Sequence, residues 1–123
     1  MQVRVARPTK DLEAAVSFYS LLELPVLASF ADHDGYSGVV LGLPDSSRQL
    51  ELVFREEVIP RPTHEDQLIF YLGSAERVAD DAARLCAGGF EPSVAPNPYW
   101  ERDGAVCFVD PDGYWIVLSP QAW

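Results

Sequence analysis

The side chains most often used for nucleophilic or metal chemistry, cysteine and histidine, are few and widely spaced in this sequence. Cys86 and Cys107 lack a C-x-x-C spacing and a nearby histidine, so we expect two reduced, mostly buried thiols. His33 stands between two aspartates in a predicted turn and His64 in a proline-containing segment, so we expect both at the surface. The sequence contains no glycine-rich dinucleotide motif, P-loop or Ser-His-Asp arrangement. Acyl transfer and phosphate binding therefore lack support.

The chain is strongly acidic. Its 9 Lys and Arg against 19 Asp and Glu give a net charge of −10. Such a surface repels phosphate backbones and offers no basic stripe for counterion release, so we expect no nucleic acid partner. The same field attracts cationic small molecules, although an acidic surface also serves solubility. Both interpretations are left open.

Length and hydropathy indicate one compact domain. A chain of 123 residues is large enough for a single core without disulfides. No apolar run approaches the roughly 20 residues that span a bilayer, so we expect no membrane association. The beginning of the sequence, MQVRVARPTK, lacks the features of a secretory signal. We therefore expect a cytoplasmic protein.

The first half of the chain reads as strand, helix and three strands. The strand before Pro8 alternates, and apolar residues then recur at helical spacing, with Thr9 as the expected cap. Asp34 followed by Gly35 favours a tight reversal, and a second turn is expected over 43–47. The expected elements are a helix over 11–22 and strands over 2–7, 26–30, 36–43 and 49–54.

The second half repeats this plan after an extended connector at 55–65. Ser74 is the expected cap of a helix over 75–85. The turn from Asp110 to Gly113 joins the last two strands, and its aspartates lack the spacing of an EF-hand. The other expected elements are a strand over 67–72, a weak strand over 92–95, a loop over 97–100 and strands over 105–109 and 114–118.

Four segments carry a family resemblance. They are RPTKDLEAAVSFYSLLELPVL, QLELVF, QLIFYL and FVDPDGYWIVL, and together they span nearly the whole chain. This combination resembles the vicinal oxygen chelate superfamily of glyoxalase I, extradiol dioxygenases, fosfomycin resistance enzymes and bleomycin resistance proteins. The resemblance implies an α+β fold in which two βαβββ modules, 1–54 and 66–119, form an incomplete curled β-barrel within a single domain over 1–123. The helices would lie outside and a ligand cavity on the concave inside.

The resemblance also implies where a metal would bind. In metal-dependent members, four inward side chains near the first, fourth, fifth and last strands hold a divalent cation, and here these positions fall on Arg4, Glu51, Gln67 and Val117. Glu51 is a first-rank ligand, but arginine is a permanent cation and valine has no donor atom. Strand parity turns His64 away from Gln67, so His64 is not expected to replace them. We therefore expect no metal or other cofactor, with a divalent metal at an altered site as the alternative.

The same alignment, extended by strand alternation, predicts a ligand-binding interior. Its expected side chains are Arg4, Gln49, Glu51, Gln67, Tyr71, Trp100 and Trp115. Ala6, Val53 and Val117 share this inward parity. One arginine, one carboxylate, amides and aromatic rings suit a ligand that is both polar and flat. The outward side chains are expected to pack under the helices, and they are Val3, Val5, Leu50, Leu52, Leu68, Phe70, Ile116 and Leu118.

Two points about this interior are left open. Arg4 and Glu51 either contact a ligand or pair with each other across the sheet. Tyr99 and Trp100, in the predicted loop, either cover an edge of the barrel or stack on a ligand.

Two functions are consistent with these residues. The first is a metal-free small-molecule-binding protein that resembles drug-sequestering proteins of the bleomycin resistance type, with a ligand that is cationic and aromatic. The second is a glyoxalase-like or dioxygenase-like enzyme with an altered metal site, in which Glu51 is the candidate general base. The resemblance also implies a homodimer.

Overall fold

The computed structural model describes residues 1–43 and 47–123. These residues form two compact units, Met1–Arg61 and Pro62–Trp123, and the boundary falls inside the predicted connector. Each unit has the order strand, helix and further strands. The fold is α+β, with two βαβββ-like modules whose sheets are not closed. The predicted turn over 43–47 includes Pro44 to Ser46, which lie outside the described residues.

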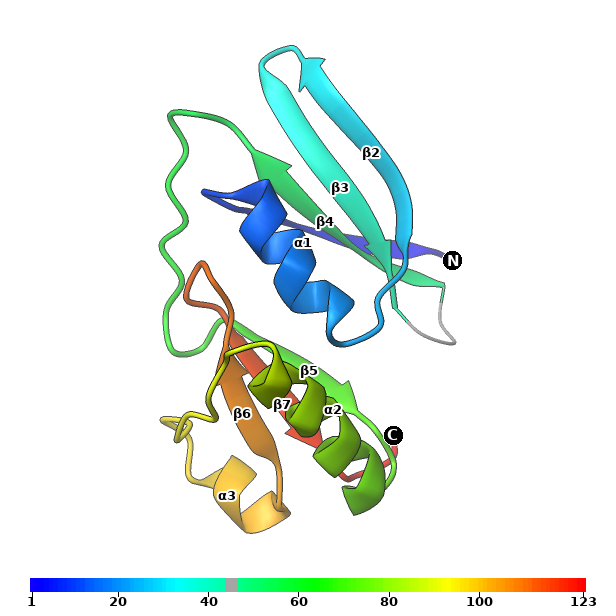
Figure 1. Ribbon diagram of the computed structural model, residues 1–123, viewed down its shortest axis with the longest axis vertical. Helices are drawn as coiled ribbons and strands as arrows, with labels where there is room; N and C mark the ends of the chain where they lie inside the picture. Colours follow the sequence, from blue (N-terminus) through cyan, green and yellow to red (C-terminus); the bar gives the residue numbers. More distant parts are fainter. Residues whose placement is uncertain (44–46) are drawn as a thin grey trace. The chain divides into compact units, whose positions relative to one another are not determined.

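Unit 1 is a four-stranded sheet with one helix against it (Figure 1). Its elements are β1 (Val3–Pro8), α1 (Leu12–Ser20), β2 (Val26–His33), β3 (Tyr36–Gly42) and β4 (Arg48–Phe54). The strand order is β1-β4-β3-β2, with β1 parallel to β4 and the other neighbours antiparallel. Asp34 and Gly35, with φ of 54° and 84°, make the tight reversal predicted between β2 and β3.

Helix α1 begins with a different cap from the predicted one. Asp11 is the N-cap, and its side chain accepts a hydrogen bond from the backbone N–H of Ala14. Thr9 is buried instead, and its hydroxyl oxygen accepts from Asp11 N at 3.3 Å. The prediction of Thr9 as the cap was wrong because the chain needs two more residues to turn from β1 into the helix, and Thr9 closes that turn.

The core of unit 1 lies between α1 and the two central strands. Ala15, Phe18 and Tyr19 are fully buried on the helix, which contacts β3 and β4. Leu50 and Leu52 of β4 are buried beneath it, as their parity predicted. Val3 and Val5 are instead 44% and 50% exposed, which corrects their predicted burial. The reason is that β1 is an edge strand, and the short helix covers β4 and β3.

Unit 2 is a three-stranded sheet. Its elements are β5 (Gln67–Tyr71), α2 (Ala75–Ala87), α3 (Tyr99–Asp103), β6 (Val106–Val109) and β7 (Trp115–Ser119). The strand order is β5-β7-β6, with β5 parallel to β7 and β6 antiparallel to it. Ser74 caps α2 as predicted, because its side chain accepts from Arg77 N. No helix in the described residues is long and apolar enough to span a membrane.

Two predictions about unit 2 were wrong. The weak strand over 92–95 is reduced to one bridge, in which Ser93 N donates to Cys107 O at 2.8 Å. Pro92 has no N–H to extend that ladder, and further prolines follow at 96 and 98. The loop predicted over 97–100 instead leads into α3, which begins at Tyr99 and ends at Gly104 in the left-handed conformation.

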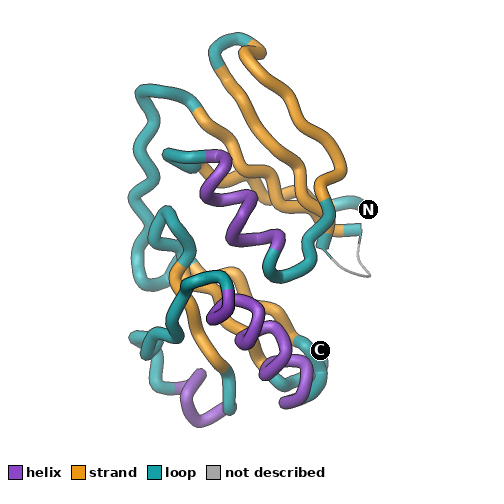
Figure 2. Tube along the Cα trace, in the orientation of Figure 1, coloured by secondary structure: helices purple, strands orange, loops and turns teal. Residues whose placement is uncertain are grey.

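The hairpin turn between β6 and β7 is held by a buried carboxylate. Asp110 is 5% exposed, and its Oδ1 accepts hydrogen bonds from the backbone N–H groups of Asp112 and Tyr114, each at 2.9 Å. Gly113 has a φ of 94°, which favours glycine at this position. The Asp110 carboxylate therefore shapes the turn, and Asp112 takes part through its backbone N–H. The segment between β4 and β5 contains neither helix nor strand (Figure 2).

Candidate functional site

Three predicted site residues meet on one face of the sheet in unit 1. Arg4 Nε donates to Gln49 Oε1 at 2.9 Å, and Arg4 Nη1 contacts Glu51 Oε1 at 3.1 Å. The Arg4 side chain is 50% exposed and that of Glu51 is 18% exposed. The ion pair left open by the sequence is therefore present, on a surface that solvent reaches. We call the face of the unit 1 sheet opposite α1 the inner face of unit 1, and the face of the unit 2 sheet opposite α2 the inner face of unit 2.

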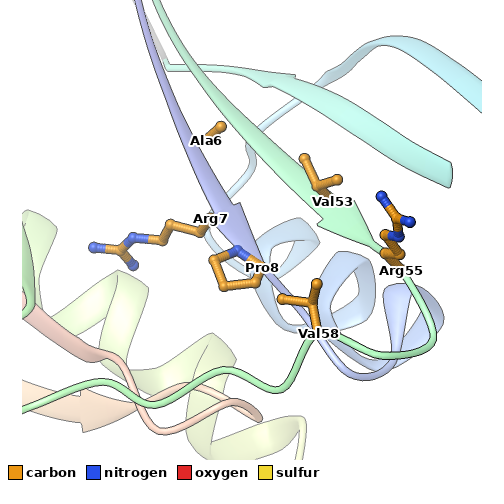
Figure 3. Close-up of a pocket in the computed structure, with 6 residues that line it drawn as sticks. All are labelled: Ala6, Arg7, Pro8, Val53, Arg55 and Val58. Atoms are coloured by element: carbon orange, nitrogen blue, oxygen red, sulfur yellow. The ribbon is translucent and has the colours of Figure 1, made fainter. Parts of the chain in front are cut away.

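A pocket continues this polar set along the same inner face. In the register of β1 and β4, Ala6 lies beside Glu51, and Pro8 lies beside Val53. Side chains on one face follow every second residue, so these pairs are successive neighbours. The pocket has a volume of about 160 Å³ and is lined by Ala6, Arg7, Pro8, Val53, Arg55 and Val58 (Figure 3). The guanidinium groups of Arg7 and Arg55 point away from each other (Figure 3), so alkyl groups make most of the wall.

The rim of this pocket is organised by Arg55. Its Nη1 donates to the Tyr36 hydroxyl at 2.8 Å, its Nε donates to Glu57 at 2.8 Å, and its Cζ lies 4.7 Å from the centre of the Tyr36 ring. The hydrogen bonds to Glu57 and then to Tyr36 raise the pKa of the Arg55 guanidinium. The bond from Arg55 lowers the pKa of Glu57. The charge at this rim is thus paired with a carboxylate outside the pocket.

The inner face of unit 2 is filled by a tryptophan. Trp100 of α3 is 6% exposed and packs with Cys107 and Val117, which are almost completely buried. Ile69 and Trp115 pack around this cluster. Because side chains alternate along β7, Ile116 and Leu118 face the other side, where α2 contacts the strand. We call the group of Trp100, Cys107 and Val117 the tryptophan cluster.

Hydrogen bonds fasten α3 to the sheet. Trp100 Nε1 donates to Gln67 Oε1 at 3.1 Å, and Gln67 Nε2 donates to the backbone oxygen of His64 at 3.1 Å. Ser119 Oγ donates to Asp103 Oδ2 at 2.7 Å at the other end of the helix. Both ends of the Gln67 amide are therefore used inside the unit. Trp100 covers the sheet, whereas its neighbour Tyr99 is 47% exposed.

The remaining candidates lie apart from these two groups. Tyr71 is 40% exposed, and its ring lies 5.8 Å from that of Trp123. His64 is exposed, as predicted, with its ring 6.2 Å from Trp115 in an edge-to-face arrangement. His33 is exposed at the end of β2. Cys107 is buried as predicted, and burial raises the pKa of its thiol, but Cys86 is exposed, which corrects its prediction.

The residues at the four metal-ligand positions do not fit a divalent cation. Arg4 places a guanidinium against the Glu51 carboxylate, and Val117 is fully buried with no donor atom. Both polar ends of the Gln67 amide are already bonded. Among residues 1–43 and 47–123, His, Cys, Asp and Glu form no group of three or more that could hold a metal ion.

Sequence reasoning missed part of the pocket and the role of α3. Ala6 and Val53 were assigned to the inner face, but Pro8, Arg55 and Val58 were not, because Pro8 ends the strand predicted over 2–7 and the other two follow the strand predicted over 49–54. A signal for α3 was present. Pro98 directly precedes the short helix and Gly104 directly follows it, and the Asn97 side chain accepts a hydrogen bond from Tyr99 N.

The chain has the fold of glyoxalase and fosfomycin resistance proteins, which is the fold of the vicinal oxygen chelate superfamily. Two solved structures show the same fold at low sequence identity. The fosfomycin resistance protein FosX from Listeria monocytogenes has a TM-score of 0.77 at 15% identity, covering 97% of this chain and 90% of that one. The antibiotic-binding protein TnmS3 from Streptomyces has a TM-score of 0.72 at 23% identity, covering 99% and 96%.

The particular family is narrower. Residues 3–53 match the YycE-like N-terminal domain and residues 65–120 match the YycE-like C-terminal domain. The YycE protein of Bacillus subtilis is 37% identical over 120 residues, which cover 95% of this chain and 86% of that protein. A crystal structure of YycE from Bacillus subtilis has a TM-score of 0.91 at 34% identity, covering 99% of this chain and 90% of that one. This chain belongs to the YycE-like family.

Proposed function

We propose that this protein binds a small organic molecule without using a resident divalent metal. The observation that carries the proposal is the Arg4–Glu51 pair at 3.1 Å, which puts a cation where a metal-dependent relative would need a ligand. A guanidinium has no lone pair to donate and repels a metal ion. The fold likeness to an antibiotic-binding protein supports a sequestering role of the bleomycin resistance type.

The candidate ligand contacts in this proposal are the seven predicted residues, of which six form two groups and Tyr71 lies apart. Arg4, Gln49 and Glu51 offer an accessible polar set in unit 1. Gln67, Trp100 and Trp115 meet in unit 2, where Gln67 and Trp115 are partly exposed and Trp100 is buried. Tyr71 contributes an exposed ring. Across the whole chain, the net charge of −10 favours cationic aromatic compounds over anionic ones at long range.

Metal content tests the first half of the proposal. The purified, untagged protein is incubated with excess nickel, zinc, manganese and iron(II), passed over a desalting column and measured by elemental analysis. We expect far less than one metal ion per chain, in the native protein and in Glu51→Ala alike. Near-stoichiometric metal that disappears in Glu51→Ala would contradict the proposal and direct attention to the enzyme alternative.

Ligand binding tests the second half. A library of natural products and aromatic amines is screened by thermal shift, and hits are confirmed by calorimetry. A compound bound with 1:1 stoichiometry and recovered unchanged after long incubation supports a binding protein. Chemical conversion of the compound would instead support the enzyme with Glu51 as general base.

We also propose a cytoplasmic homodimer, as the resemblance implies. The edge strand β1 carries Val3 and Val5 at 44% and 50% exposure, an apolar pair that a second copy of this chain would cover. Light scattering coupled to size exclusion measures the mass, and Val5→Lys is the variant expected to give monomer. A monomeric native protein would remove this part of the proposal.

A further inference from the structure

The pocket beside Val53 has the size and wall of a site for one apolar ring. Its volume is about 160 Å³, and alkyl groups of Ala6, Pro8, Val53 and Val58 make most of its surface (Figure 3). An apolar cavity of about 150 Å³ is known to admit benzene. Val58 is 41% exposed in the free protein, so a ligand in the pocket would remove apolar surface from water.

The polar set lies one step away along the same strand. Glu51 and Val53 are two residues apart on β4, a separation of about 6.6 Å on one face of a strand. The bonds within the polar set use Arg4 Nε and Nη1 and Glu51 Oε1. Arg4 Nη2 therefore offers a donor and Glu51 Oε2 an acceptor. An apolar pocket and a donor–acceptor pair are adjacent on one surface.

The charge at this position selects against charged groups. A cationic group at Glu51 would also face Arg4, and an anionic group at Arg4 would also face Glu51. A neutral group that both accepts and donates hydrogen bonds satisfies both side chains. The Arg4–Glu51 pair thus favours a neutral ligand group at the site, whereas the net charge of the chain favours cationic molecules at long range.

We propose that the Arg4–Glu51 pair and the adjacent pocket form one binding site for an uncharged amphipathic molecule, with a phenyl-sized apolar group and a carboxamide-like group about 6.6 Å apart. This inference rests on the proposed small-molecule-binding function and names the class of ligand. The carboxamide oxygen accepts from Arg4 Nη2, and its N–H donates to Glu51 Oε2. The ring lies between Pro8, Val53 and Val58.

Three matched probes test the ligand class. They are 3-phenylpropanamide, 3-phenylpropanoate and 3-phenylpropylamine, which share one ring and linker and differ in the charge of the terminal group. Each is titrated into ¹⁵N-labelled full-length protein and followed by NMR. We expect the amide to bind about tenfold more tightly than either charged analogue. The amide bonds to both members of the pair, whereas each charged group bonds to one member and is repelled by the other. The shifts should fall on residues 4–8 and 49–58.

Two neighbouring variants test the pocket. Val58→Asp introduces a charge into the pocket wall, whereas Ile59→Asp changes the next residue, which is 65% exposed and is not part of the wall. We expect Val58→Asp to weaken amide binding about tenfold, because the carboxylate would be buried against the ring. Ile59→Asp should leave the affinity unchanged. Val58→Ser replaces Val58→Asp if the backbone ¹H–¹⁵N spectrum shows that Val58→Asp is unfolded.

Several results would overturn the inference. Tighter binding of a charged analogue would overturn the ligand class, and equal effects of Val58→Asp and Ile59→Asp would overturn the pocket. Unit 2 has another pocket, of about 190 Å³, lined by Trp100, Ala105 and Cys107 among others, and shifts confined to it would place the site elsewhere. The absence of binding by all three probes would also refute it. The proposed metal-free binding function is judged separately by metal content and by the library screen.

Discussion

The inner faces of the two units show how one module plan yields two different surfaces. In unit 1, β2 and β3 extend the sheet to four strands, and the inner face carries the half-exposed Arg4–Glu51 pair and a pocket. In unit 2, the strand equivalent to β2 is reduced to the Ser93–Cys107 bridge, and α3 places Trp100 over the inner face. The first face is accessible and polar, whereas the second is largely a packed core.

The difference lies in the segment that comes after the long helix of each unit. After α1, the chain Val26–His33 pairs along β3 and leaves the inner face open. After α2, a proline-containing segment cannot continue the ladder, and the chain instead forms a short helix that packs beneath the sheet. Val117, at the position equivalent to Glu51 in the alignment, is then fully buried, whereas the Glu51 side chain is 18% exposed. Alignment alone does not distinguish these two environments.

The largest expected effect comes from emptying the tryptophan cluster. Trp100→Ala removes a 6% exposed side chain and its hydrogen bond to Gln67, so we expect a loss of about 3–5 kcal/mol in the free energy of unfolding. Urea unfolding followed by circular dichroism measures it. Tyr99→Ala is the control, with an expected loss of about 1 kcal/mol or less, because Tyr99 makes an edge contact from an exposed position. Equal losses would show that Trp100 is not the packing centre of unit 2.

A smaller effect is expected on the inner face of unit 1. An added Cβ at Gly38 would lie 2.5 Å from Phe30 Cζ and 2.9 Å from the backbone oxygen of Leu52. Gly38→Ala should therefore cost about 1–3 kcal/mol, because the ring can move but the backbone oxygen cannot move easily. Gly42→Ala should cost less, since its Cβ would meet only the flexible side chain of Leu27, at 3.1 Å. The same unfolding experiment compares them, and a reversed order would contradict this account of the face.

A still smaller effect on stability is expected at the polar set. Glu51→Gln removes the partner of a half-exposed arginine, so the free energy of unfolding should change by less than about 1 kcal/mol. The change should shrink further in high salt because the pair is screened. Unfolding midpoints at low and high salt measure it. A loss as large as that of Trp100→Ala would mean that this face is a packed core like that of unit 2.

The smallest expected effect is a pH dependence from Cys107. Burial raises its pKa above the ordinary thiol value of 9.0, so the unfolded chain loses this proton first as pH rises. The stabilising contribution of the protonated Cys107 thiol to the free energy of unfolding is fully present below pH 9.0. It is lost as the pH rises toward the higher pKa of the native state. Unfolding between pH 8 and 10 measures the slope for Cys107→Ala, which should be shallower, and for the exposed control Cys86→Ser, which should not change. Equal slopes for both variants would show that the tryptophan cluster does not shield the thiol.

Much of the fold was predictable from local patterns. The Asp34–Gly35 reversal and the Ser74 cap were confirmed, because each depends on a few neighbouring residues. Of the candidate site, the alignment and strand parity placed Arg4 and Glu51 on one face and left open whether they pair, and the structure shows the pair. The role of α3 was missed, because a five-residue helix leaves almost no periodic signal. The burial of Val3 and Val5 was predicted wrongly because alternation does not reveal how far a helix extends over a sheet.

By itself, the sequence determined the elements that depend on neighbours along the chain: the two repeated strand and helix patterns, the turn around Asp110, and the absence of metal-ligating side chains at Arg4 and Val117. These follow from side-chain chemistry and from short-range backbone preferences. The tertiary structure decided which inner face is open. That outcome depends on whether a distant segment, here the one carrying Trp100, packs onto the sheet, and packing between distant segments is settled by shape and burial rather than by local pattern.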